Sequence, residues 1–161
     1  MHKARRWHWL AGAFALAAGA ASAQPAREQP ANHFNDPFAQ VTTGIADCPP
    51  QPGPLITLAE RRAQEHGRVE RGTSCYRSGR CRLPNAYLYD AEIIPRVRQA
   101  ILYDDRFADT SVWVEGQRRW VWLRGCVRQP EQAAALEQIV RSIDDVEAVI
   151  NELVVRPPDL R

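Results

Sequence analysis

The residues with the clearest chemistry in this 161-residue sequence are its four cysteines, Cys48, Cys75, Cys81 and Cys126. Thiols form disulfides, bind metals or act as nucleophiles. A zinc site would need further ligands, but no Cys-x-x-Cys spacing occurs and, after residue 23, the only histidines are His33 and His66. An even number of cysteines in an exported chain predicts two disulfides instead.

The pairing of the four cysteines stays open, because three connectivities are possible. The five residues between Cys75 and Cys81 include Gly79 and can turn as a short loop, which would place these two cysteines opposite each other. That favours Cys75 with Cys81 and Cys48 with Cys126. In every pairing, Cys126 is joined to a cysteine of the N-terminal region.

The remaining candidates for catalytic groups are two pairs of adjacent carboxylates, Asp104-Asp105 and Asp144-Asp145. We interpret both pairs as solvated helix ends, because no other site chemistry accompanies them. The C-terminal third has no histidine, and its one cysteine is expected to be oxidised, so the usual general bases and thiol nucleophiles are missing. The sequence therefore predicts no enzyme, no metal site and no cofactor.

The N-terminus has the three parts of a secretory signal peptide. A basic stretch at 2–6 precedes an apolar run from Leu10 to Ala21, and Ala21-Ser22-Ala23 forms a small-residue cleavage site. An uncleaved anchor is disfavoured, because it would need about 20 apolar residues and the polar sequence from Gln24 follows at once. We expect residues 1–23 to be removed after Ala23 and the mature chain to lie in the periplasm.

The mature chain would be almost neutral. Removal of Lys3, Arg5 and Arg6 leaves 18 basic residues against 19 acidic ones, so the formal charge falls from +2 to −1. No run of clustered lysines and arginines indicates a nucleic-acid footprint or a polybasic lipid anchor.

The first part of the mature chain has a weak structural pattern. Residues 24–56 are rich in proline and are expected to be extended or flexible. Thr57 and Glu60 have the spacing of a capping box, which predicts a helix of about three turns ending near Gly72. Its thin apolar stripe indicates weak docking, with His66 in the interface. Residues 57–91 are thus predicted to be a helix followed by a charged, cysteine-containing loop.

The C-terminal part has a regular pattern of apolar residues with helical and strand periods. The glycine of 115–118 indicates a turn between two strands. The predicted elements are a helix from about Ile94 with Pro95 in its first turn, strands at 111–114 and 120–127, a helix opening at Pro130, and a strand at 149–155.

Two stretches in this region resemble the BON domain family. Val121-Trp122-Leu123-Arg124-Gly125-Cys126-Val127 is similar to the family's V-x-L-x-G-x-V, and residues 146–155 are similar to its closing G-V-x-x-V-x-N-x-L-x-V. Asp145 stands where the family usually has glycine. In these stretches Gly125 and Asn151 are interpreted as structural positions.

The resemblance implies an α+β fold at 92–156, followed by a tail at 157–161. The expected layout is αββαβ, a small three-stranded sheet packed on two helices, with a disulfide-linked N-terminal extension. It also implies a non-catalytic binding module of the bacterial cell envelope that associates with phospholipid or an envelope assembly. The alternative is a soluble periplasmic scaffold or chaperone-like protein that binds a polypeptide.

Strand alternation predicts which side chains would do the binding. If the strand valines face the helices, an aromatic face lies on the other side of the sheet. Three tryptophans could expose on the order of 500 Å² there, so either the N-terminal region covers this face or it binds a ligand. The side chains predicted on it are Trp113, Trp120, Trp122, Arg124, Cys126, Ile150 and Val154.

Overall fold

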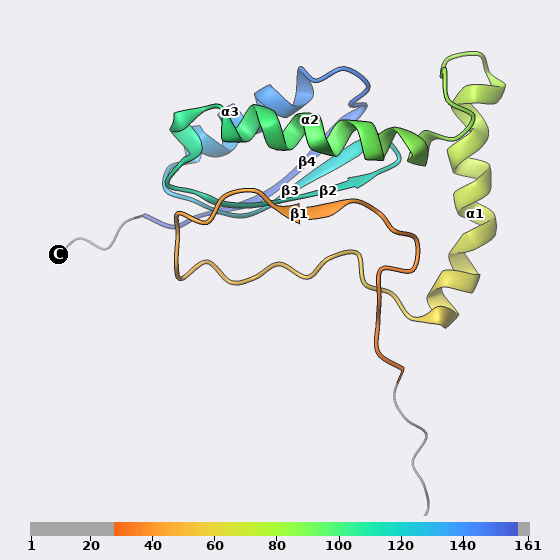
Figure 1. Cartoon of the computed structure of the whole chain (residues 1–161), viewed down its shortest axis with the longest axis horizontal. Coiled ribbons are helices and arrows are strands. Elements are labelled where there is room, and N and C mark those ends of the chain that lie inside the picture. The colour runs from red at the N-terminus through yellow and green to blue at the C-terminus, as the bar shows by residue number, and fades with distance from the viewer. Residues whose placement is uncertain (1–27, 158–161) are drawn as a thin grey trace, which may run out of the picture.

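The computed structural model describes residues 28–157, so the predicted signal peptide and most of the tail lie outside the described residues. The fold is α+β (Figure 1), with three α-helices and one four-stranded sheet in the described range. The elements are β1 (Phe38–Gln40), α1 (Leu58–Arg77), α2 (Asp90–Leu102), β2 (Ser111–Gln117), β3 (Trp120–Val127), α3 (Pro130–Arg141) and β4 (Ala148–Val155).

The sheet has the order β1-β2-β3-β4. Strands β1, β2 and β3 pair antiparallel, and β4 returns through α3 to pair parallel with β3. The prediction of a three-stranded sheet is wrong, because β1, from the segment expected to be extended or flexible, pairs with β2 with Ala39 opposite Val114. A short strand on this edge satisfies backbone groups that β2 would otherwise leave open.

Helices α2 and α3 cover one face of the sheet (Figure 1). The alternation predicted for the hairpin is present, because the valines and leucine assigned to the helix side are fully buried. They meet apolar side chains from α2 and α3 and from Phe107. The strand residues in this core are Val112, Val114, Val121, Leu123 and Val127.

The hairpin turn lies later than predicted. Gly116 is inside β2, and the chain reverses at Arg118 and Arg119, which both have positive φ angles, 58° and 67°. Gly116 is required for packing, since a Cβ there would lie 2.7 Å from the side chain of Ile94. The turn is held by Asp90, whose carboxylate accepts hydrogen bonds from both arginine backbone amides, at 2.6 and 2.7 Å.

Two helices are longer than predicted. The capping box at Thr57 and Glu60 is present, but α1 continues past Gly72 to Arg77. Gly72 lies inside the helix and not at its end, and it is needed for packing, because a Cβ there would be 2.3 Å from the amide oxygen of Asn85. Helix α2 starts at Asp90, directly after a 3-10 turn at Ala86–Tyr89, so Pro95 lies inside the helix and not in its first turn.

Candidate functional site

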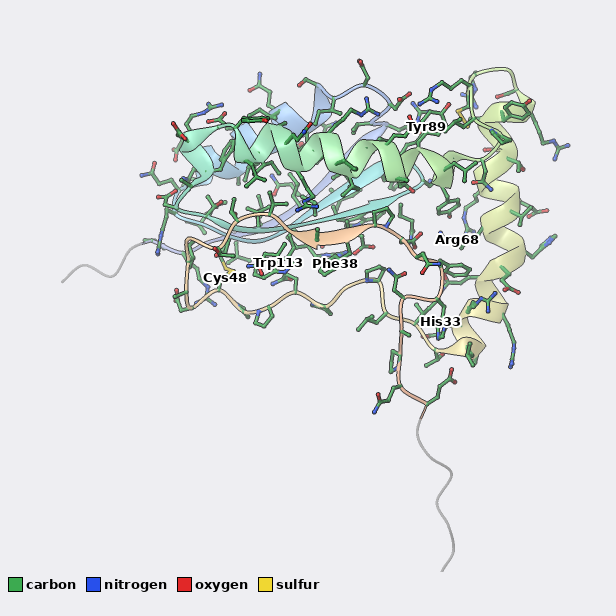
Figure 2. All side chains as sticks on the ribbon, in the orientation of Figure 1. His33, Phe38, Cys48, Arg68, Tyr89 and Trp113 are labelled. Atoms are coloured by element: carbon green, nitrogen blue, oxygen red, sulfur yellow. A yellow bond between two sulfur atoms is a disulfide. The ribbon has the colours of Figure 1, made fainter. Side chains whose placement is uncertain are left out.

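The sheet face opposite the helices is covered at one end by the N-terminal segment. Trp113 and Cys126 are buried there under Phe38, Ile45 and Cys48, and Figure 2 shows Trp113, Phe38 and Cys48 together on this side of the sheet. A disulfide joins Cys48 to Cys126, with 5.8 Å between their Cα atoms. The second disulfide joins Cys75 to Cys81. Both pairs are those favoured from the sequence.

The cover is also fixed by polar contacts. The Ser111 hydroxyl accepts a hydrogen bond from the Ile45 amide at 2.9 Å and donates to the Ile45 carbonyl at 3.0 Å. Thr42 is buried beside it, and its hydroxyl lies 2.9 Å from that of Thr110. The segment after β1 is therefore bonded to β2 and to the residue before it, and does not merely lie across the face.

The other end of the face is only partly covered. Trp120 and Trp122 are half-buried, with ring centroids 6.1 Å apart and ring planes tilted by 37°. The Arg118 guanidinium lies 4.9 Å from the centroid of the Trp120 ring. On β4, Ile150 lies beside Trp122 in register, and Val154, farther along the strand, is 57% exposed. We call Trp120, Trp122 and Ile150 the open aromatic face.

A row of charges separates the covered end from the open end. Arg124 follows Trp122 on β3 with one residue between, and it forms ion pairs with Glu115 on β2 and with Glu152 on β4, the latter at 2.7 Å. The residues predicted for the far face thus lie on one side of the sheet, but Trp113 and Cys126 are buried while Trp120 and Trp122 are not.

The two structural positions named from the sequence make specific contacts. Gly125 has φ +114°, and a Cβ there would lie 2.1 Å from the Ser111 carbonyl oxygen. Asn151 donates from its amide to the Ala133 carbonyl at 3.0 Å and to the Glu137 carboxylate at 3.2 Å. Gly125 thus permits close strand contact, and Asn151 ties β4 to α3.

Helix α1 is anchored by a buried ion pair that the sequence reasoning missed. Arg68 extends from α1 (Figure 2) and donates to Asp36 at 2.9 Å. Its guanidinium lies 4.0 Å from the ring centroid of Phe34 and 3.8 Å from that of Tyr87. Both charged groups are buried. The expected interface residue, His66, is instead exposed: 86% of its side chain is accessible. The local sequence gives no sign that Arg68 is buried, because its partners Asp36, Phe34 and Tyr87 lie far from it in the chain.

A second site was also missed, a cavity of about 290 Å³ between α1 and the β2–β3 turn. Burial raises the pKa of Asp90, which holds this turn, to about 6, against the opposing effect of its two backbone hydrogen bonds. The only sequence signal for the cavity is the Arg118-Arg119 pair at a hairpin turn. We call it the arginine pocket; its polar lining is Arg71, Ser74, Arg80, Arg118, Arg119 and Glu147.

The adjacent carboxylates face arginines. Hydrogen bonds from Arg106 lower the pKa of Asp104, and Asp145 lies 3.2 Å from Arg96. Within residues 28–157 no group of three or more His, Cys, Asp or Glu side chains is placed to hold a metal ion. In the same range no helix is long and apolar enough to cross a membrane.

The α+β module thus has two surface features, a partly covered aromatic face and a charged pocket. Residues 89–157, which contain α2 to β4, match the BON domain family, and this part of the chain is a BON domain. The family is generally non-catalytic and is associated with phospholipid and the cell envelope. No curated protein matches the chain closely enough to count as a relative.

Proposed function

We propose that this protein is exported to the periplasm and binds phospholipid at a membrane surface of the cell envelope. The observation that carries the proposal is the open aromatic face, where Trp120 and Trp122 stay partly exposed although the N-terminal segment covers the neighbouring Trp113. The cover buries one tryptophan of three and leaves the other two accessible.

The chemistry of this face fits the headgroup region of a bilayer. Tryptophan has an apolar ring and a polar N–H, and it is enriched where a membrane meets water. The Trp120 N–H has no hydrogen-bond partner within the described residues, so it can donate to a lipid oxygen once the ring turns outward. Arg118, next to this ring, supplies a positive charge for a phosphate.

Vesicle co-sedimentation of the mature, oxidised protein tests the proposal, with vesicles of phosphatidylcholine alone and mixed with phosphatidylglycerol. We expect the Trp120→Ala, Trp122→Ala double variant to bind at least about tenfold more weakly, because burying even part of each ring contributes on the order of 1 kcal/mol. The matched control is Tyr103→Ala, which removes an aromatic ring that is 85% exposed at the end of α2.

Folding of each variant is checked by its urea midpoint. Native-like vesicle binding by the folded double variant would refute the proposal, and so would an equal loss in the Tyr103 control. Preference for the phosphatidylglycerol vesicles that is lost in an Arg118→Asn variant would place Arg118 in the contact.

A second candidate function is binding of a polypeptide, and it is favoured by the free edge of β4. Within the described residues β4 pairs only with β3, and its eight residues end in the exposed Val154 and Val155. An extended peptide can add to such an edge. Capture of a periplasmic polypeptide by the native protein but not by a folded Val154→Lys variant would support this function, and equal capture by both would count against it.

A further inference from the structure

We propose that the arginine pocket binds a phosphate group, carried either by a small soluble molecule or by a lipid headgroup. The pocket is built jointly by the BON domain and the region before it, because Arg118 and Arg119 come from the β2–β3 turn whereas Arg71 lies on α1 and Arg80 in the loop after it. In its lipid form the inference rests on the proposed membrane binding, and in its soluble form it does not.

The lining of the arginine pocket carries an excess of positive charge. Four arginines and one glutamate line the cavity, in a chain whose formal net charge is only +2 over 161 residues. Within the described residues Arg71, Arg80 and Arg118 form no ion pair, and Arg119 reaches Glu147 only at 3.9 Å. Four guanidinium groups gathered in a concave site with a single carboxylate favour an anion.

The backbone of the β2–β3 turn is strained at two of the pocket's arginines. Arg118 and Arg119 both have positive φ, a conformation that asparagine and glycine adopt easily and that costs a long side chain on the order of 1 kcal/mol. Asparagine and glycine would therefore make a more stable turn here. The buried Asp90 holds the turn in place through the backbone amides of both arginines. Arg118 and Arg119 therefore keep their strained backbone conformation at a fixed place in the fold. Strain of this kind is common at binding sites.

Contacts with the surrounding protein fix the side chain of Arg119 in the pocket. The Arg119 side chain is only 21% exposed, and its Nε donates to the Asp145 carbonyl at 2.8 Å. Its guanidinium lies 5.1 Å from the Tyr89 ring, and Nη1 is 3.4 Å from the Cys81 sulfur. The Cys75–Cys81 disulfide closes the loop that carries Arg80. Arg119 is thus held in place before a ligand arrives, which lowers the entropy cost of binding.

The size and chemistry of the cavity select the ligand class. A volume of about 290 Å³ admits a phosphate with a few attached atoms but not a nucleic-acid duplex or a folded polypeptide. The planar guanidinium donates in pairs to phosphate oxygens, a geometry for which arginine is better suited than lysine. A phosphate monoester, with its two negative charges, matches the excess of arginines.

Isothermal titration calorimetry with inorganic phosphate and with glycerol 3-phosphate tests the inference on the mature, oxidised protein. We expect Arg118→Asn to weaken binding about tenfold, by loss of one charge-assisted contact, while raising the melting temperature by about 2–4 °C through relief of the turn. If Arg118 had only a structural role, its replacement would not weaken phosphate binding while raising the melting temperature.

Three further variants sharpen the test. Arg80→Gln, in the loop after α1, should also weaken phosphate binding about tenfold. Glu147→Gln should strengthen phosphate binding by about twofold to fivefold, because it removes an exposed negative charge that repels the phosphate. Arg98→Gln is the control, since Arg98 is an exposed arginine on α2 that forms no ion pair within the described residues and does not line the cavity.

Calorimetry together with vesicles separates the two sources of phosphate. Arginine-dependent preference for phosphatidic acid over phosphatidylglycerol vesicles identifies a lipid headgroup, and calorimetric binding without that preference identifies a soluble ligand. One outcome would refute the phosphate pocket and leave the membrane proposal intact: tryptophan-dependent binding to vesicles, no binding of either phosphate probe, and native-like vesicle binding by Arg118→Asn. If phosphate binds but no vesicle does, the membrane proposal fails alone.

Discussion

Breaking the disulfide between Cys48 and Cys126 should destabilise the protein far more than breaking the one between Cys75 and Cys81. The first joins residues 78 positions apart and the second joins residues 6 apart. If each bond acts by restricting the unfolded chain, the loop lengths give about 4.5 kcal/mol for the first and about 2 kcal/mol for the second. The expected difference is therefore about 2 kcal/mol.

The long-range bond has a second effect that the short one lacks. It fastens the N-terminal cover over Trp113, which is buried beside both of its cysteines. Losing the Cys48–Cys126 bond should therefore also loosen the cover and shift tryptophan emission to longer wavelength before the sheet unfolds.

Urea denaturation of two double variants, Cys48→Ala with Cys126→Ala and Cys75→Ala with Cys81→Ala, measures both effects. Tryptophan fluorescence reports the cover and far-UV circular dichroism reports the fold. Equal losses of unfolding free energy in the two variants would refute the loop-length reasoning. Unchanged emission in the first variant would show that hydrogen bonds such as those of Ser111 hold the cover without the disulfide.

Two other substitutions test buried positions. Because burial raises the pKa of Asp90 from 3.8 to about 6, the fold favours its protonated form. The contribution of Asp90 to the free energy of unfolding is therefore complete only below the unfolded pKa of 3.8 and is lost as pH rises through about 6. Relative to Asp90→Asn, the native protein should lose about 2.4 kcal/mol of unfolding free energy between pH 4 and 7, and parallel pH curves would contradict this. Gly125→Ala should cost about 3 kcal/mol or more, since its Cβ would meet the Ser111 carbonyl oxygen, whereas Gly79→Ala, with positive φ but open space, should cost only about 1 kcal/mol in the same urea assay.

Local patterns in the sequence predicted much of the C-terminal half. The valines of β2 and β3 alternate with polar and aromatic residues, so their burial follows from strand geometry. The helix opening at Pro130 and the capping box at Thr57 are also present, because both depend on contacts within a few residues. Such features can be predicted because all the residues that form them lie in one short segment of the sequence.

The features that the sequence did not reveal depend on contacts between distant residues. Strand β1 has three residues and no clear period, and it forms because β2 offers an open edge. The turn at Arg118 and Arg119 contradicts the preference for Gly116, because Asp90 supplies acceptors for both arginine amides from 28 and 29 residues away. In both cases the sequence around one partner contains no sign of the other.

The region before the BON domain therefore does more than cover an apolar surface. Residues 89–157 alone contain Arg118, Arg119 and the open aromatic face, but they lack Arg71 and Arg80 and would leave Trp113 bare. The buried pair of Arg68 with Asp36 fixes α1 next to the turn, so half of the arginine pocket depends on an ion pair outside the family match. A BON domain without this extension could still present its tryptophans to a membrane, but it could not form the same anion site. Under the proposed phosphate binding, ligand selection is thus a property of the extension as much as of the domain.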